Sequence, residues 1–358
     1  MRDQLVEYLS TCISFDSIEE KPKQKQECMD WITSVFLGED LAHVIHGKIK
    51  ECPYVYVPNP HAEFLWFAHV DVVPALPEQF VLRIEGDSAY GRGVKDMKGA
   101  ALSFLIAYAE ARAKGEHPKV SILLTSDEEI GGSTIPTLLD QGIVHANAAF
   151  TPDSGSDPWI VTEHKGVVWG DLTASGQGGH GSMPWESTNP IPLLMKALEI
   201  LAKEFPSGTE TDWQITVTPT QLEGSDARNK IPDVARCGLD IRYPKSICNS
   251  EKEVLSLIQK VLPEGCVVSA ARSASPHWTD PNHPLVQLFK DTAELVIGKN
   301  VEIGKEHGGT DARYFGERNI PAFLYGPEGG NLHGANEWVS VSSLQKHIDL
   351  YTTLFSRL

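Results

Sequence analysis

Long apolar runs are missing from this chain of 358 residues. No stretch approaches the roughly 18 consecutive apolar residues that a membrane-spanning helix needs, so we expect no membrane partner. The first residues, MRDQLVEYLSTCISF, place charges among apolar positions and lack the small-residue cleavage pattern of a secretory signal. They predict an amphipathic helix and a cytoplasmic protein.

Cysteine pairs and an excess of positive charge are missing as well. No Cys-x-x-Cys pair indicates a zinc knuckle or a redox site, because the six cysteines are scattered along the chain. The formal net charge of −17 opposes binding to phosphate backbones, since Lys and Arg supply most of the affinity for nucleic acids. We therefore expect a small-molecule partner and no nucleic acid.

The pattern of apolar and polar residues changes twice along the chain. Residues 1–165 alternate helix-period segments with short apolar runs at 64–68, 120–125 and 148–150, as is typical of an α/β sheet. Residues 166–272 follow the order strand, helix, strand, strand, helix, strand, which fits a two-layer α+β sandwich. Residues 273–358 resume the first pattern, with helices expected at 284–297 and from about 341. The sequence thus predicts an α/β domain interrupted by an inserted α+β domain.

Histidines and carboxylates recur where expected strands end or where glycines gather. They are His69 with Asp71, Asp96 within GRGVKDMKGA, the adjacent pair Glu128 and Glu129, Asp153, and His333. Each signal is weak by itself: Asp71 could simply orient the His69 ring, Asp96 could cap a helix, and the glutamate pair could be a solvated turn. Together, two histidines and three carboxylates form a ligand set for a pair of divalent ions, with Glu128 left free to act on water. That combination indicates hydrolysis.

Eight stretches in a fixed order carry a resemblance to a known family: AHVDVVP, YGRGVKDMKGA, TSDEEIGG, GGHGSMP, NKIP, LDIRY, GGTDARYF and LHGANE. The sequence resembles the metallopeptidase family of aminoacylase, acetylornithine deacetylase, succinyl-diaminopimelate desuccinylase, glutamate carboxypeptidase and related dipeptidases. The resemblance implies a mixed-sheet, di-zinc exopeptidase-type catalytic domain in residues 1–165 and 273–358, with residues 166–272 as a lid and dimerisation domain. Cobalt or manganese could replace zinc, because an O/N ligand set accepts several of these metals.

The resemblance also implies a role for each residue of the metal site. His69 and Asp153 would bind one ion, Glu129 and His333 the other, and Asp96 would bridge the two after a cis peptide bond to Met97. Glu128 would activate a metal-bridged water and later protonate the departing nitrogen, while Asp71 would support His69.

Further residues are implied to contact the substrate. His180 would stabilise the oxyanion, in dimeric members by reaching into the neighbouring subunit of a homodimer. Arg242, Asn229, Gly309 and Thr310 would hold the substrate carboxylate, for which the planar fork of an Arg is suited. The alternatives are that Arg242 is a surface residue of a strand and that His180 is a loop residue without a role in catalysis.

Two positions depart from the family pattern. Many deacylases and carboxypeptidases carry Glu where this chain has Asp153, whereas several dipeptidases carry Asp, and His307 stands where a small residue is common. We therefore expect an exopeptidase or dipeptidase that cleaves an amide next to a free carboxylate. The alternatives are an N-acyl-amino-acid deacylase of the acetylornithine or succinyl-diaminopimelate type, and a non-catalytic metal-binding protein, against which Glu128 argues.

Overall fold

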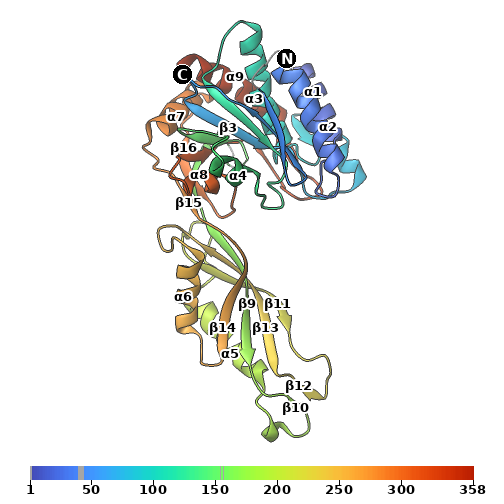
Figure 1. Ribbon diagram of the computed structural model, residues 1–358, viewed down its shortest axis with the longest axis vertical. Coiled ribbons are helices and arrows are strands. Elements are labelled where there is room, and N and C mark those ends of the chain that lie inside the picture. The colour runs from blue at the N-terminus through green and yellow to red at the C-terminus, as the bar shows by residue number, and fades with distance from the viewer. Residues whose placement is uncertain (1, 39–43, 154, 156) are drawn as a thin grey trace. The chain divides into compact units, whose positions relative to one another are not determined.

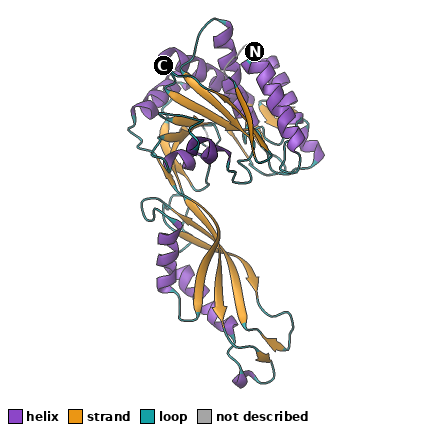
Figure 2. Cartoon of the chain, viewed as in Figure 1, coloured by secondary structure: helices purple, strands orange, loops and turns teal. Residues whose placement is uncertain are grey.

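The computed structural model describes residues 2–38, 44–153, 155 and 157–358 (Figures 1 and 2). The chain divides into two compact units. The first unit comprises residues 1–163, 279–305 and 310–358, and the second comprises 164–278 and 306–309. The sequence predicts the insertion at 166–272. Within the second unit, the backbone N–H of Lys165 bonds to the carbonyl of Glu306 at 3.3 Å.

The helices of the first unit come from both ends of the sequence. They are α1 (Arg2–Ser14), α2 (Pro22–Ile32), a π-helical turn (Thr33–Leu37), a 3-10 turn (Pro77–Phe80), α3 (Lys98–Ala113), α4 (Thr134–Asp140), α7 (Pro284–Ile297), α8 (Ala312–Gly316) and α9 (Val341–Arg357). The expected amphipathic helix at the start is α1, which buries Leu5, Leu9 and Ile13.

A mixed sheet forms the centre of the first unit. Its order is β1 (Ile45–Ile49), β2 (Cys52–Val57), β6 (Val120–Thr125), β3 (Phe64–His69), β7 (Ala149–Thr151), β17 (Ala322–Leu324) and β8 (Trp159–His164), with β16 (Glu302–Glu306) also paired to β8. Strands β6, β3, β7 and β17 run parallel, whereas β1, β2 and β8 run antiparallel to their neighbours. The expected mixed α/β fold is confirmed.

Helices cover both faces of this sheet, which explains why its central strands read as unbroken apolar runs. On β3, Phe64 and Trp66 face a core shared with α1, α2, α3, α7 and α9, and Trp66 stacks on Phe104 of α3 with ring centroids 4.1 Å apart. Leu65 and Phe67 face the opposite way, into a core shared with α4 and α8. The three strands expected from sequence at 64–68, 120–125 and 148–150 are β3, β6 and β7.

A smaller antiparallel sheet has no counterpart in the sequence analysis. Its order is β18 (Gly329–Gly330), β19 (Trp338–Ser340), β5 (Ser88–Tyr90) and β4 (Arg83–Glu85). The β19 and β5 strands pair Trp338 with Tyr90 and Ser340 with Ser88. This pairing brings a late segment of the chain beside the glycine-rich run that begins at Gly91.

The second unit is the expected two-layer sandwich. A four-stranded antiparallel sheet has the order β11 (Thr216–Glu223), β13 (Val234–Tyr243), β9 (Gly166–Ser175) and β14 (Cys266–Ala274). Helices α5 (Pro190–Glu204) and α6 (Glu251–Val261) share a core with this sheet. The remaining elements are β10 (Gly179–His180), a 3-10 turn (Pro184–Glu186), β12 (Lys230–Ile231) and β15 (His277–Trp278).

The alternation of residues along β9 and β13 gives the sandwich one covered face. Leu172 and Ala174 of β9 and Leu239 and Ile241 of β13 pack against the helices, while residues that alternate with them, such as Trp169, are exposed.

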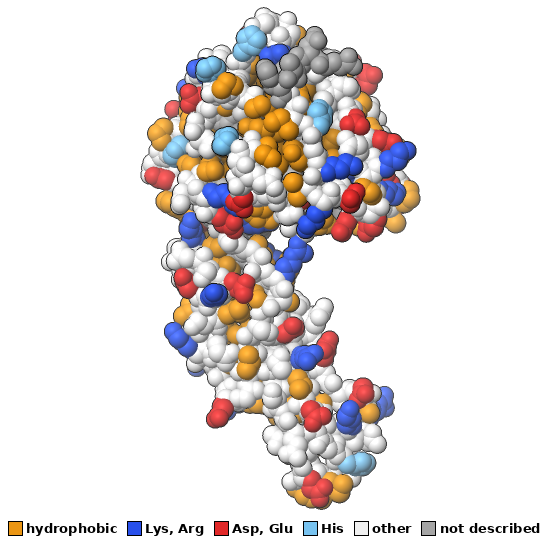
Figure 3. Space-filling view, viewed as in Figure 1, with side chains coloured by type: hydrophobic (Ala, Val, Ile, Leu, Met, Phe, Trp, Pro, Cys, Tyr) orange, Lys and Arg blue, Asp and Glu red, His pale blue; other side chains and the backbone are white. Residues whose placement is uncertain are grey.

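On the face drawn in Figure 3, Lys and Arg side chains are interspersed with Asp and Glu. Among the described residues, none of the helices has both the length and the apolar character needed to cross a membrane.

Candidate metal centre

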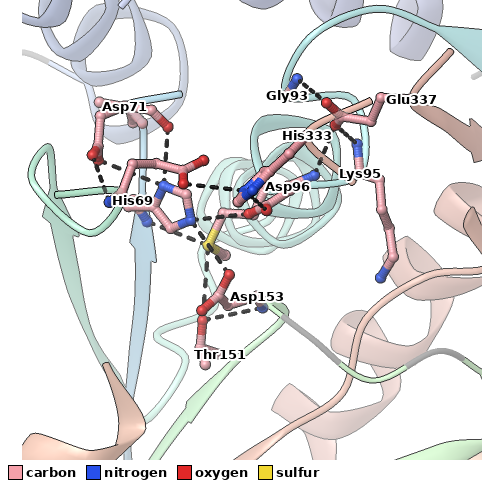
Figure 4. Close-up of polar contacts among 12 residues, drawn as sticks. His69, Asp71, Gly93, Lys95, Asp96, Thr151, Asp153, His333 and Glu337 are labelled. Atoms are coloured by element: carbon pink, nitrogen blue, oxygen red, sulfur yellow. Dashed lines mark hydrogen bonds and ion pairs between the residues drawn. The ribbon is translucent and has the colours of Figure 1, made fainter. Parts of the chain in front are cut away.

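Three neighbouring parallel strands of the central sheet deliver acidic and imidazole side chains to the same edge. His69 is the last residue of β3, Glu128 and Glu129 follow β6, and Asp153 follows β7. Ligand sites in open α/β sheets gather at the carboxyl ends of the strands, and these residues obey that rule. Asp96 joins them from the loop before α3, and His333 joins them from the loop between β18 and β19 (Figure 4).

Two overlapping groups of side chains could each hold a metal ion. The first group is His69, Asp96 and Asp153, and the second is Asp96, Glu129 and His333. In the first, Nε2 of His69 lies 3.2 Å from Oδ1 of Asp96 and 3.3 Å from Oδ1 of Asp153. In the second, Nε2 of His333 lies 3.2 Å from Oδ2 of Asp96 and 3.2 Å from Oε2 of Glu129. Asp96 therefore turns one carboxylate oxygen towards each group.

The imidazole of His69 presents a ligand nitrogen to its group. Nδ1 lies 3.0 Å from the backbone carbonyl of Asp71, and a carbonyl only accepts, so Nδ1 carries a proton in the neutral ring. The lone pair of Nε2 then faces the two carboxylates. Burial alone would lower the pKa of His69, but hydrogen bonds with Asp153 and then Asp71 and Asp96 raise that pKa well above its usual value. The surrounding carboxylates thus favour a positive charge at this point.

The second group shows the same excess of negative charge. Hydrogen bonds to Asp96 and then Glu129 raise the pKa of His333 to about 10. Burial opposes ionisation of Asp96, yet hydrogen bonds from His333 and His69 hold the pKa of its carboxyl well below the ordinary range. Burial raises the pKa of Glu129 and of Asp153. A divalent cation in each group would relieve this crowding of carboxylates.

Zinc-sized ions fit the spacing of these donors. A tetrahedral ion with ligands at about 2.0–2.1 Å separates neighbouring ligand atoms by about 3.3 Å, and the four measured separations are 3.2–3.3 Å. Oε1 of Glu129 is buried and has no hydrogen-bond partner among the described residues. The donor set of imidazole nitrogens and carboxylate oxygens is one that zinc, cobalt and manganese accept.

Glu128 stands beside these groups without belonging to either. Its carboxylate has no hydrogen-bond or ion-pair partner in the part of the chain that the structure describes. Burial, followed by the negative charges of Asp153 and Asp311, raises the pKa of Glu128 well above its usual value. A carboxyl group without a protein partner is available to exchange a proton with a nearby water.

Asp71 supports the centre in two ways. Its backbone carbonyl bonds to His69, and its Oδ2 accepts a hydrogen bond of 3.0 Å from the backbone N–H of Glu129. Its Oδ1 lies 3.5 Å from Nδ1 of His69, at the long limit of a hydrogen bond, where its negative charge still favours a positive imidazole. The sequence reasoning anticipated contact with His69 but missed the bond to the loop of Glu129.

The Asp96–Met97 peptide bond is cis, as the resemblance implied. Around Asp96 the sequence reasoning missed a partner, Glu337. Glu337 is buried, and its Oε1 accepts hydrogen bonds from the backbone N–H groups of Lys95 and Asp96 at 3.0 and 3.1 Å (Figure 4). No sequence signal pairs positions so far apart.

The second unit brings two further candidates together at the short β10–β12 ribbon. His180 pairs with Lys230, and the N–H of Gly181 donates to the carbonyl of Asn229 at 2.7 Å. Nδ1 of His180 accepts from the backbone N–H of Ser182 at 3.2 Å and lies 2.7 Å from its hydroxyl. The neutral ring therefore carries its proton on Nε2, and the exposed imidazole presents a donor.

The other candidates have partners of their own. Arg242 on β13 gives its Nε and Nη2 to the carboxylate of Asp240 at 2.7 and 3.0 Å. Thr310 is buried, and its carbonyl accepts from Nη1 of Arg313 at 2.8 Å. Gly309 is exposed. His307, whose effect the sequence left open, reaches the carbonyl of Glu210 at 2.9 Å within the second unit.

Comparison with known proteins identifies the family. The model of peptidase family M20/M25/M40 matches residues 65–357 of the chain. The chain belongs to this family. It is therefore a metal-dependent hydrolase of amide bonds. Succinyl-diaminopimelate desuccinylase of Xanthomonas campestris pv. campestris (strain 8004) is 28% identical over 324 residues, which cover 81% of this chain and 82% of that relative.

Solved structures of family members have the same fold. Aminopeptidase PepT of Bacillus cereus ATCC 10987 aligns with a TM-score of 0.80 at 18% identity and covers 99% of this chain and 98% of its own. The metallo-carboxypeptidase Sso-CP2 of Sulfolobus solfataricus aligns with a TM-score of 0.77 at 20% identity and the same coverage. The Bacillus subtilis YXEP protein, described as a dinuclear metal binding peptidase, has a TM-score of 0.67 at 13% identity over 99% of this chain and 98% of its own.

Proposed function

We propose that this family member hydrolyses an amide or peptide bond next to a free carboxylate, as an exopeptidase or dipeptidase that uses two metal ions. The observation that carries the proposal is the arrangement of Asp96 between two histidine-containing groups, with Glu128 unpaired beside them. His69 and Asp153 would hold one ion, Glu129 and His333 the other, and Asp96 both. Zinc is the expected metal in each position. Two such ions, when bound, polarise the amide carbonyl and make a water more acidic.

The remaining chemistry is assigned to side chains of this chain. Glu128 takes the proton of the attacking water and returns it to the departing nitrogen, because it lies beside His69 and Asp153 and belongs to neither ligand group. His180 donates from Nε2 to the oxyanion, because its Nδ1 is occupied by Ser182. Asn229, Arg242, Gly309 and Thr310 hold the substrate carboxylate.

The neighbouring glutamates offer a matched test of these roles. Glu128→Gln should keep both ions and lower kcat by about 10²- to 10⁴-fold, the usual contribution of a general acid–base group. Glu129→Gln should instead lose one ion, because it removes a ligand. Ion content is measured by elemental analysis after gel filtration, beside kcat. Unchanged turnover in Glu128→Gln would rule out the proposed mechanism.

A homodimer through the second unit remains part of the proposal, with His180 acting on the site of the neighbouring subunit. Mixing His180→Ala with Glu128→Gln protein tests it, because a mixed dimer would contain one site with both residues intact. After equimolar mixing and random subunit exchange, activity should return to about a quarter of wild type, because half of the dimers are mixed and each has one intact site of two. Failure of any activity to return would favour action within one chain.

An N-acyl-amino-acid deacylase is the second candidate, favoured by the 28% identity to succinyl-diaminopimelate desuccinylase. Both activities need the same metal centre. The substrates differ on the carbonyl side of the cleaved amide, which carries an amino-acid residue in a dipeptide and an acyl group in an N-acyl amino acid. The discriminating experiment compares kcat/KM for a series of dipeptides with that for N-acetyl and N-succinyl amino acids, each with Zn²⁺, Mn²⁺ and Co²⁺. A preference for acylated amino acids over all dipeptides would replace the leading proposal by this one.

A further inference from the structure

A buried carboxylate and a buried guanidinium meet beside the candidate metal centre, from segments far apart in the sequence. Nη1 of Arg92 lies 2.6 Å from Oε2 of Glu337, and both side chains are almost completely buried. Neither residue belongs to the ligand groups. An ion pair excluded from water is costly unless its remaining donors and acceptors are satisfied, so its other partners show what it holds in place.

The Glu337 carboxylate accepts hydrogen bonds from backbone N–H groups of the loop that carries Asp96. Oε2 accepts from the N–H of Gly93 at 3.0 Å, while Oε1 accepts from the N–H groups of Lys95 and Asp96 at 3.0 and 3.1 Å (Figure 4). Three amide donors and one guanidinium nitrogen therefore converge on two oxygens. Charge-assisted bonds of this kind are about twice as strong as neutral ones. They fix the point from which the Asp96 side chain leaves the backbone.

The Arg92 guanidinium holds the other segment. Its Nη2 donates to the carbonyl of His333 at 2.9 Å and approaches the carbonyl of Gly334 at 3.4 Å. His333 has a φ of 61°, a left-handed conformation that is uncommon outside glycine, so its backbone needs external contacts to remain there. The same side chain thus bonds the Glu337 carboxylate with one nitrogen and the backbone of His333 with the other.

We infer that Arg92 and Glu337 form a positioning pair that sets the geometry of the second metal group. The pair acts through the backbone of Asp96 and of His333, two of the three residues of that group. Among the described residues, His69 and Asp153 of the first group bond to neither residue of the pair. Because His333 belongs to the second group alone, the effect falls mainly on the second ion. The inference rests on the proposed ligand set.

The test measures ion affinity without turnover. Wild type, Glu337→Gln and Arg92→Lys are stripped with a chelator, checked by circular dichroism and thermal unfolding, and titrated with Zn²⁺ against a competing chelator. Glu337→Gln keeps the size of the side chain but offers –NH₂ where two amides need an acceptor. Arg92→Lys keeps the positive charge but loses the fork that joins Glu337 to His333, and it serves as an independent perturbation of the same pair.

A matched control comes from the turn between β4 and β5 of the small sheet. The carboxylate of Asp87 accepts from the hydroxyls of Ser340 and Ser342 at 2.6 and 2.7 Å and from the N–H of Ser342 at 3.1 Å, without contact to Asp96 or His333. Asp87→Asn should therefore bind both ions as wild type does. Glu337→Asp, which retains the charge on a shorter side chain, should recover part of the affinity that Glu337→Gln loses.

The expected result is a selective loss. The first ion should bind within about threefold of wild type, and the second about 10- to 100-fold more weakly, as is usual when a residue that orients metal ligands is changed. The inference is overturned if Glu337→Gln and Arg92→Lys both bind the second ion within threefold of wild type. If wild type does not bind two ions, or His333→Ala still binds both, the proposed ligand set is what fails.

Discussion

Mild acid should destabilise this protein through one buried imidazole, His347 on α9. Its ring stacks on Tyr325 with centroids 5.1 Å apart, and its Nε2 is buried without a hydrogen-bond partner among the described residues. Burial, and secondarily the positive charge of Lys95, lowers the pKa of His347 from 6.5 to about 3. The unfolded chain therefore binds a proton here at a pH where the folded chain does not.

The sign and size of the effect follow from this difference. Well above pH 6.5 the imidazole of His347 is neutral in both the folded and the unfolded chain, so it does not affect the free energy of unfolding. Below pH 6.5 it takes up a proton in the unfolded chain only, which favours unfolding. Stability should fall by about 1.4 kcal/mol for each pH unit below 6.5, which amounts to about 2 kcal/mol at pH 5. The loss should level off near pH 3, at about 5 kcal/mol.

The dependence of stability on pH is measured by urea unfolding of the chelator-treated protein between pH 5 and 7.5, with circular dichroism as the signal. His347→Phe keeps a ring against Tyr325 and removes the titrating group, so its free energy of unfolding should fall about 2 kcal/mol less than that of wild type over this range. Parallel pH curves for wild type and His347→Phe would refute the reasoning, whatever their constant offset.

Three further predictions concern the loops of the centre and the substrate carboxylate. Gly99→Ala would place its Cβ 2.1 Å from the carbonyl oxygen of Val94, so it should lower the free energy of unfolding by about 2–3 kcal/mol, as read from urea curves. Asp127→Ala removes the acceptor of three bonds from Ser133 and Thr134 at the start of α4 and should cost about 2 kcal/mol in the same assay. Arg242→Lys should raise KM at least tenfold for a substrate with a free carboxylate and leave KM unchanged for its carboxamide; equal effects on both would show that Arg242 does not read the carboxylate.

The strands that carry the centre could be predicted because they are short, apolar and buried on both faces. The run Phe64–His69 has no polar residue before its final histidine, so the end of the strand and the first ligand coincide in the sequence. Val120–Thr125 is buried along its whole length and has only Ser121 as a polar residue before Thr125, and the glutamate pair follows three residues later. A sheet then brings these ends together by its own geometry.

The contacts that hold the loops could not be predicted in the same way. At the start of α4, the N–H and hydroxyl of Thr134 both bond to Oδ2 of Asp127, so the acceptor comes from seven residues earlier. Glu337 and Arg92 meet across 245 positions, because the β5–β19 pairing sets their register and not any local pattern. The bond between Arg242 and Asp240 was accessible from sequence, since residues two apart on a strand share a face.

The shared position of Asp96 has a consequence for the order in which the centre is built during synthesis. His69, Asp96 and Asp153 all precede the inserted unit in the sequence, whereas His333 is made only after that unit has been added. A growing chain thus contains the first three ligands before it contains His333, which lies beside Oδ2 of Asp96 in the complete protein. The second group would close last, when β19 pairs with β5, and an incomplete chain would lack the paired ions that the proposed hydrolysis requires.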